Sequence, residues 1–193
     1  MKSILIIIAA VVMFAGLTPA QSDLQDEQFY LGAIAQRRNI DVVRDLRPSS
    51  LTDSIGVTFE YSHFLGGSKK AAKKGWFGVG IDYAVLFHAN QPNGSKVAQQ
   101  AGHFVVTLQN RNAKRFQPFI KGGIGVARDD FGGVSFSNDR LVGPDATRSI
   151  VAGGGIDTVL RGRLKWRVGA EYQNTAFGGS QQHNVRVTSG LVF

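Results

Sequence analysis

The pattern of apolar and polar residues along most of this 193-residue chain alternates with a period of two. Such alternation is typical of β-strands that have one apolar face and one mixed face. Polar or glycine-rich stretches divide the alternating part into eight segments. These are residues 28–36, 54–64, 76–87, 103–110, 116–128, 149–159, 164–173 and 183–193. We therefore predict an all-β fold with eight strands.

The connections between these segments alternate in length. Long polar connections follow the first, third, fifth and seventh segments, at residues 37–53, 89–102, 129–148 and 174–182. The others, at residues 65–75, 111–115 and 160–163, are mostly shorter. Strands of about ten residues, with long loops at one rim and short turns at the other, are typical of a membrane-spanning β-barrel. The pattern predicts an antiparallel up-and-down transmembrane barrel.

The mixed face carries many of the 24 glycines and a balanced set of charges. The interior of an eight-stranded barrel is just wide enough for side chains to fill it, so glycines would leave room for long charged residues. We predict a lumen ion network, because buried charges need partners. A solvated face with balanced charges is the alternative. The predicted network consists of Glu60, Asp82, Lys121, Asp157, Lys165, Arg167, Glu171 and Arg186.

Aromatic residues on the apolar face fall near the ends of the predicted strands. Such positions predict aromatic girdles at the two membrane interfaces. The residues are Phe29, Tyr61, Phe77, Phe87, Phe104, Phe116, Trp166, Tyr172 and Phe193. The alternation alone leaves a soluble exported barrel open, in which the apolar face would point inward and bind a small apolar ligand.

Residues 1–20 have the pattern of an export signal. Lys2 precedes an apolar run, and Thr18, Pro19 and Ala20 end it. The run is too short to span a membrane, so we predict a Sec signal peptide at 1–20, cleaved after Ala20, and a barrel domain at 21–193. An uncleaved N-terminal anchor is the alternative. The chain has no cysteine, which excludes disulfides and thiolate chemistry.

The stretches FYLGAIAQ, FQPFIKGGIGVAR, WRVGAEYQ and VRVTSGLVF, together with the leader, resemble the OmpA/OmpX-like outer-membrane β-barrel superfamily. The resemblance implies a protein of the bacterial outer membrane, in contact with its lipid and lipopolysaccharide. It also implies a strand that the outer-membrane assembly machinery reads through Val185, Val187, Leu191 and Phe193. Ser189 departs from the apolar pattern of that strand.

Sequence motifs give little support for catalysis. Ser180 lies near His183, and Ser62 precedes His63, but no G-x-S-x-G motif occurs. A lipid-modifying enzyme therefore remains a minor alternative. We predict no catalytic, metal-binding or cofactor-binding site, because metal-ligand and dinucleotide motifs are missing from the sequence.

The chain has a net charge of +8, and residues 68–74 form a basic cluster that contributes to it. We interpret this cluster as a solvated turn, with contact to an anionic partner as the alternative. Nucleic-acid binding is not expected of an exported chain whose other basic residues are scattered. The predicted role is structural or surface-interacting, in envelope integrity or loop-mediated recognition. The sequence identifies no partner for the long loops. Eight strands leave too little lumen for a wide pore.

Overall fold

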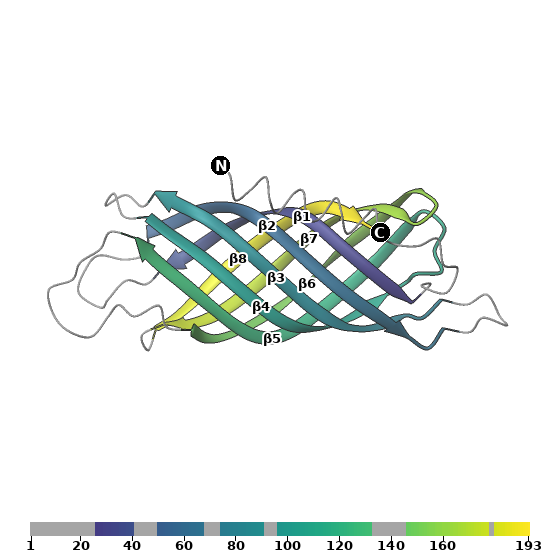
Figure 1. The fold of residues 1–193 in the computed structure, drawn as a ribbon, viewed down its shortest axis with the longest axis horizontal. Helices are drawn as coiled ribbons and strands as arrows, with labels where there is room; N and C mark the ends of the chain where they lie inside the picture. The colour runs from purple at the N-terminus through teal and green to yellow at the C-terminus, as the bar shows by residue number, and fades with distance from the viewer. Residues whose placement is uncertain (1–25, 41–49, 68–73, 91–95, 133–145, 178–179) are drawn as a thin grey trace, which may run out of the picture.

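The strands of the chain close into one antiparallel β-barrel (Figure 1). The computed structural model describes residues 26–40, 50–67, 74–90, 96–132, 146–177 and 180–193, so the predicted signal peptide lies outside the described residues. The strands are β1 (Glu27–Ile40), β2 (Ser50–Leu65), β3 (Phe77–Asn90), β4 (Lys96–Gln109), β5 (Phe116–Gly132), β6 (Ala146–Arg161), β7 (Leu164–Phe177) and β8 (Ser180–Val192). Each pairs with its neighbours in sequence, and β1 pairs with β8. The predicted eight-stranded up-and-down barrel is confirmed.

The alternation of residue types separates the inside of the barrel from the outside. Ile55 is 70 % exposed on the outer surface, whereas Arg167 is 2 % exposed inside. The mixed face therefore lines the interior. The soluble-barrel alternative is wrong on this point, because it required the apolar face to point inward.

The strands extend further toward the long connections than the alternation predicted. Only residues 178–179 separate β7 from β8, so the predicted long connection at 174–182 is wrong. The β7–β8 ladder continues through Thr175↔Gln182 to Phe177↔Ser180. Backbone pairing persists there although polar residues occupy both faces, and a prediction based on hydrophobic alternation misses such an extension.

We call the end of the barrel where β2, β4 and β6 end and β3, β5 and β7 begin the short-turn end (Figure 1). Gly162, in the β6–β7 turn, has a φ of 60°. This left-handed conformation strains a residue with a side chain, and it lets the chain reverse between Arg161 and Leu164.

The seam between the first and last strands is closed by main-chain hydrogen bonds. The Phe193 amide donates to the Phe29 carbonyl at 2.9 Å, and the Phe29 amide donates back at 3.2 Å. Ser189, the polar residue on the outer face of β8, accepts a hydrogen bond from Trp166 Nε1 at 3.0 Å. Its hydroxyl therefore has a partner on the neighbouring strand.

Candidate functional site

The outer face of the barrel carries an apolar belt. On β5, the outward positions from Phe116 to Val126 are apolar, and Arg128 follows them. At about 3.3 Å per residue the strand advances ~33 Å over this stretch, which a tilt of about 40° reduces to roughly 25 Å of height. That height matches the lipid-facing band of outer-membrane barrels. Outward-facing Arg148 pairs with Val126 and marks the same edge on β6.

Aromatic side chains are concentrated at the short-turn edge of this belt. The Phe29 and Tyr61 rings lie 5.0 Å apart there, on β1 and β2. The short-turn group is Phe29, Tyr61, Trp76, Phe77, Phe116, Trp166 and Phe193. Phe104 departs from the predicted girdle, because it pairs with Ile81 and Ile124 inside the belt.

Lys121 is the centre of a buried ion cluster in the middle of the lumen. Its Nζ lies 2.9 Å from Glu60 Oε2, 2.8 Å from Asp82 Oδ2 and 2.7 Å from Glu171 Oε1. These carboxylates come from β2, β3 and β7, so one ammonium on β5 links opposite walls of the barrel. All four side chains are nearly excluded from solvent.

Arg167 forms a second buried centre that shares Glu60 with the first. Its Nε lies 2.7 Å from Asp157 Oδ1, its Nη2 lies 3.0 Å from Asp157 Oδ2, and its Nη1 lies 3.0 Å from Glu60 Oε1. The guanidinium carbon is 4.3 Å from the Phe119 ring centroid and 5.1 Å from that of Tyr30. Ion pairs and aromatic faces together hold this cation in a fixed position.

Glycine makes room for the ring that contacts Arg167. A Cβ at Gly155 would lie 3.0 Å from Phe119 Cε1, and one at Gly169 would lie 3.5 Å from Cζ. The ring therefore packs across β6 and β7 where they lack side chains. The glycines predicted to leave room for charged residues here make room for an aromatic one.

Two oxygens that already accept from Arg167 also accept hydrogen bonds from neutral donors. Gln109 Nε2 donates to Asp157 Oδ2 at 2.6 Å, and Gln28 Nε2 donates to the same atom at 3.2 Å. Ser62 Oγ donates to Glu60 Oε1 at 3.3 Å. Hydrogen bonds of this kind offset part of the desolvation cost of the buried carboxylates.

A layer of amides and hydroxyls lies beside the ion cluster. Arg186 Nε donates to Gln36 Oε1 at 2.7 Å, and Gln36 Nε2 donates to Gln99 Oε1 at 3.2 Å. His103 Nε2 lies 2.8 Å from Ser149 Oγ, and its Nδ1 lies 3.5 Å from Asp82. Polar side chains therefore fill this part of the lumen as well.

The structure buries all eight residues of the predicted lumen set but does not bring all of them into one cluster. Lys165 lies at the short-turn end, and Arg186 lies among amides. The ion pairs join the other members: Glu60, Asp82, Lys121, Asp157, Arg167 and Glu171. Tyr30, Phe119 and His103 were missed as members of the lumen, although their inward positions in the alternation could have identified them.

The β8 residues of the predicted assembly signal face outward. Val185, Val187, Leu191 and Phe193 are all exposed on the outer surface. They lie in the apolar belt, away from the ion cluster.

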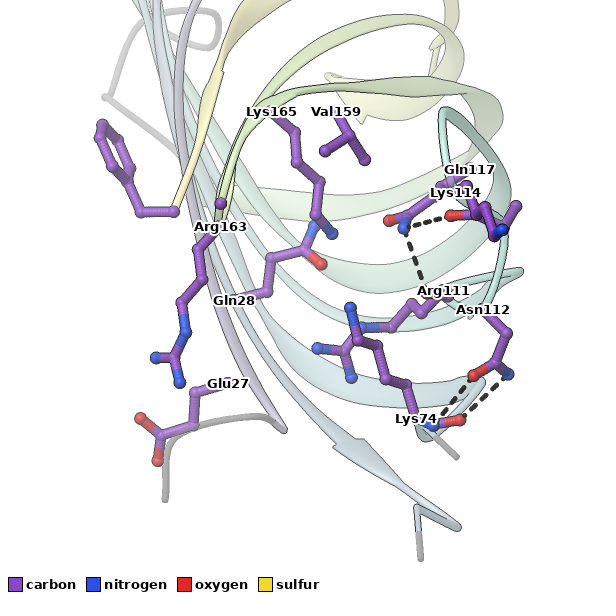
Figure 2. Close-up of a pocket in the computed structure, with 13 residues that line it drawn as sticks. Glu27, Gln28, Lys74, Arg111, Asn112, Lys114, Gln117, Val159, Arg163 and Lys165 are labelled. Carbon is purple, nitrogen blue, oxygen red and sulfur yellow. Dashed lines mark hydrogen bonds between the residues drawn. The ribbon is translucent and has the colours of Figure 1, made fainter. Parts of the chain in front are cut away.

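A cavity of about 430 Å³ opens at the short-turn end of the barrel (Figure 2). Its walls come from the starts of β1, β5 and β7, the end of β6 and the turns beside them. The charged lining residues are Lys74, Arg111, Lys114, Arg163, Lys165 and Glu27. The lining therefore has more basic than acidic groups. We call this feature the basic mouth.

Arg111, in the β4–β5 turn, has a buried side chain at the short-turn end of the barrel. Its guanidinium carbon lies 4.2 Å from the centroid of the Phe64 ring. Burial lowers the pKa of Arg111, while the carboxylates of Asp26 and Asp157 act in the opposite direction. Arg111 packs between the end of the lumen and the turns.

The serine–histidine neighbours are placed differently from a catalytic pair. Ser62 is buried and bonded to Glu60, whereas the next residue, His63, is exposed outside. His183 Nδ1 is hydrogen-bonded to the hydroxyl of Tyr172. The side chain of Ser180 lies outside the described residues. Among the residues that the structure describes, no cluster of potential metal ligands occurs, and no helix is long and apolar enough to cross a membrane.

The fold is similar to those of solved outer-membrane proteins. No protein-family model and no curated protein matches the sequence. Neisserial surface protein A is 11% identical with a TM-score of 0.59, and the match covers 85% of this chain and 95% of that one. OprG from Pseudomonas aeruginosa is 12% identical with a TM-score of 0.54, over 88% and 98%. Ail, the attachment invasion locus protein of Yersinia pestis, is 12% identical with a TM-score of 0.52, over 86% and 97%. The chain therefore has the fold of the OmpA/OmpX-like eight-stranded outer-membrane β-barrels.

Proposed function

We propose that this chain is an integral protein of the bacterial outer membrane with a structural or surface-interacting role. In this role the barrel is a scaffold that presents the long connections at the outer surface. The observation that carries the proposal is the belt on the outer face, which is apolar from Phe116 to Val126 and bounded by Arg128. Burying such a surface in lipid is favourable, whereas exposing it to water is costly.

Because side chains fill the lumen, a structural role for the barrel is favoured over the role of a wide pore. Lys121 and Arg167 connect acids from several strands across the barrel. Opening a wide path would require these buried charges to lose their partners, at a large free-energy cost. We assign no catalytic role and no cofactor to the lumen.

The names of proteins with similar folds support the proposed role at the cell surface. One neighbour is named a surface protein, and another is named for attachment and invasion. Ail has also been solved in complex with the heparin analogue sucrose octasulfate. For this chain, we propose that residues 41–49, 91–95 and 133–145, which connect the strands at the end opposite the short turns, carry the recognition. We further propose that outward Arg128 and Arg148 contact the phosphates of lipopolysaccharide.

Membrane fractionation, followed by gel electrophoresis with and without boiling, tests the location. We expect the protein in the outer-membrane fraction, with a mobility that shifts on heating because the closed barrel resists unfolding in cold detergent. Recovery from the periplasm without detergent, and without a shift, would contradict the proposal. Planar-bilayer recording adds a separate test, since a large steady conductance would contradict the filled lumen but not the location.

We further propose that Val185, Val187, Leu191 and Phe193 guide assembly in the outer membrane. Phe193 also closes the seam through main-chain hydrogen bonds to Phe29. Phe193→Ala keeps those main-chain groups and removes only the ring. We expect this variant to accumulate less in the outer membrane in cells, yet to refold in detergent like the wild type. Val126→Ala, in the belt on β5, is the control.

Normal assembly of Phe193→Ala in cells would contradict the signal role. If refolding in detergent fails to the same extent as assembly in cells, the ring acts in the barrel itself, and the assembly proposal also fails. Deletion of Phe193 removes the seam hydrogen bonds as well. We expect the deletion to impair both processes.

A further inference from the structure

The basic mouth is a cavity whose charges are not balanced within its own walls. Lys165 is only 9% exposed and lines the cavity. Within the described part of the chain, it makes no hydrogen bond or ion pair. A buried ammonium normally has a counter-charge or polar partners, because burial without them is costly. Among the described residues, Lys165 is attracted by the Asp157 carboxylate but has no carboxylate in direct contact, unlike Lys121.

The other cations of the mouth surround the same cavity. Lys74 precedes β3, Lys114 belongs to the β4–β5 turn, and Arg163 belongs to the β6–β7 turn. Glu27 is the acidic side chain among the lining residues that the structure describes. Like charges so close together repel one another, and an anion in the cavity would relieve that repulsion.

The polar amides of the mouth serve as its scaffold. Gln117 Nε2 donates to the carbonyls of Arg111, at 3.1 Å, and Ala113, at 2.9 Å (Figure 2). Asn112 Oδ1 accepts from the Lys74 amide at 3.0 Å, and Asn112 Nδ2 donates to the Lys74 carbonyl at 3.4 Å. These bonds hold the turns in place, so the cations project from a preorganised frame and less entropy is lost when a ligand binds.

We infer that the basic mouth is a binding site for a phosphate-bearing anion. Three ammonium groups and two guanidinium groups line one cavity, and they favour a multiply charged oxyanion over a single carboxylate. A volume of about 430 Å³ accommodates more than a bare phosphate ion, so a phosphorylated small molecule or a lipid headgroup would fit. Phe193 lines the cavity and also belongs to the aromatic short-turn group, which places the mouth close to the belt edge. This site goes beyond the surface and structural role and does not depend on it.

Phosphorus NMR on the barrel folded in a neutral detergent tests the site. One arm titrates inorganic phosphate, and the other titrates a short-chain phosphatidylglycerol, with the matching phosphatidylcholine as a zwitterionic reference. We expect line broadening that saturates with protein concentration in at least one arm and weakens as salt is added. Binding of phosphatidylglycerol alone identifies a lipid headgroup, and binding of inorganic phosphate shows that a free phosphate suffices.

The matched variants are Lys165→Gln and Arg115→Gln. Arg115 belongs to the β4–β5 turn but is not among the cavity-lining residues, and its guanidinium lies 5.2 Å from the Phe116 ring centroid. We expect Lys165→Gln to weaken binding about tenfold or more, as for loss of one charge-assisted contact. Arg115→Gln should stay within about twofold of the wild type, because it removes an equal charge outside the cavity.

Every variant is first checked for a heat-modifiable band, and Lys114→Gln replaces Lys165→Gln if the latter does not fold. Equal weakening by Arg115→Gln would show general charge attraction and overturn the site. Absence of binding in both arms with the wild-type barrel would also overturn it.

Discussion

Two lysines with the same chemistry lie in opposite electrostatic situations in this barrel. Lys121, in the middle of the lumen, has three carboxylates within 3 Å of its Nζ. Lys165, at the short-turn end, shares its cavity with other cations. Both are largely buried. A position on the inward face of a strand therefore does not by itself define the role of a lysine. Lys121 stabilises the barrel, and Lys165 is placed to attract a ligand.

The two regions also differ in what surrounds the charge. The mid-lumen cations are bridged by acids on several strands, and Arg167 lies near two aromatic rings. The mouth is built from turns that side-chain amides hold in place. Substitutions in the lumen should therefore change stability, and substitutions in the mouth should change binding.

The largest effect is expected for Lys121→Met. The substitution leaves Glu60, Asp82 and Glu171 buried close together without their shared cation. Removing one partner of a buried ion pair typically costs about 3–5 kcal/mol. Urea unfolding in phospholipid vesicles should show a fall of this order in the free energy of unfolding. A loss below about 1 kcal/mol would mean that water or rearrangement replaces the lysine.

Phe119→Leu should have an intermediate effect. The variant removes the ring next to Arg167 but keeps an apolar side chain over Gly155 and Gly169. Loss of the cation–π contact and of packing should cost about 1–2 kcal/mol. The same unfolding measurement on Phe119→Leu, on Arg167→Met and on the double variant separates the cation–π contribution from the packing contribution. If the two substitutions add without coupling, the ring and the guanidinium do not interact.

Asn112→Ala tests whether the turns of the basic mouth are preorganised for binding. The change removes two hydrogen bonds between the β4–β5 turn and the peptide groups of Lys74. We expect a loss of stability of about 0.5–1 kcal/mol, because these bonds lie at an exposed turn. Phosphate binding should weaken although no charge has been removed. Unchanged phosphate affinity in the NMR titration would argue against a preorganised mouth.

The smallest effect on stability is expected for Lys165→Met. Removing this cation relieves repulsion within the basic mouth and leaves no acid without an ion-pair partner. The free energy of unfolding should stay within about 0.5 kcal/mol of the wild type or rise. A loss as large as that of Lys121→Met would break the distinction between the two regions.

The sequence was sufficient to predict which face of each strand lines the lumen, because in a strand the alternation of side chains fixes inside and outside. It placed Lys121 and Arg167 in the same interior as their acids. It did not separate Lys165 and Arg186 from the ion cluster, because depth along the barrel depends on the stagger between strands, which the alternation does not specify.

The sequence pattern also did not predict features that are built from turns or from extensions of strand pairing, because the alternation does not specify which residues barrel closure brings together. The basic mouth assembles residues from both ends of the sequence, such as Glu27 and Lys165, that only barrel closure brings together. The β7–β8 extension pairs Thr175 with Gln182, which carries no hydrophobic signal. The aromatic lining by Tyr30 and Phe119 followed the alternation but ran against the expectation of a charged and glycine-rich lumen.

Urea unfolding of the wild type, Lys121→Met and Lys165→Met, each with and without the phosphate ligand found by NMR, tests the distinction most directly. We expect Lys121→Met to unfold at lower urea and still be stabilised by the ligand, as linkage requires of a protein that binds it only when folded. Lys165→Met should unfold like the wild type and lose that stabilisation. Equal destabilisation of both variants, or equal stabilisation of all three proteins by the ligand, would contradict the separation of a structural lumen from a binding mouth.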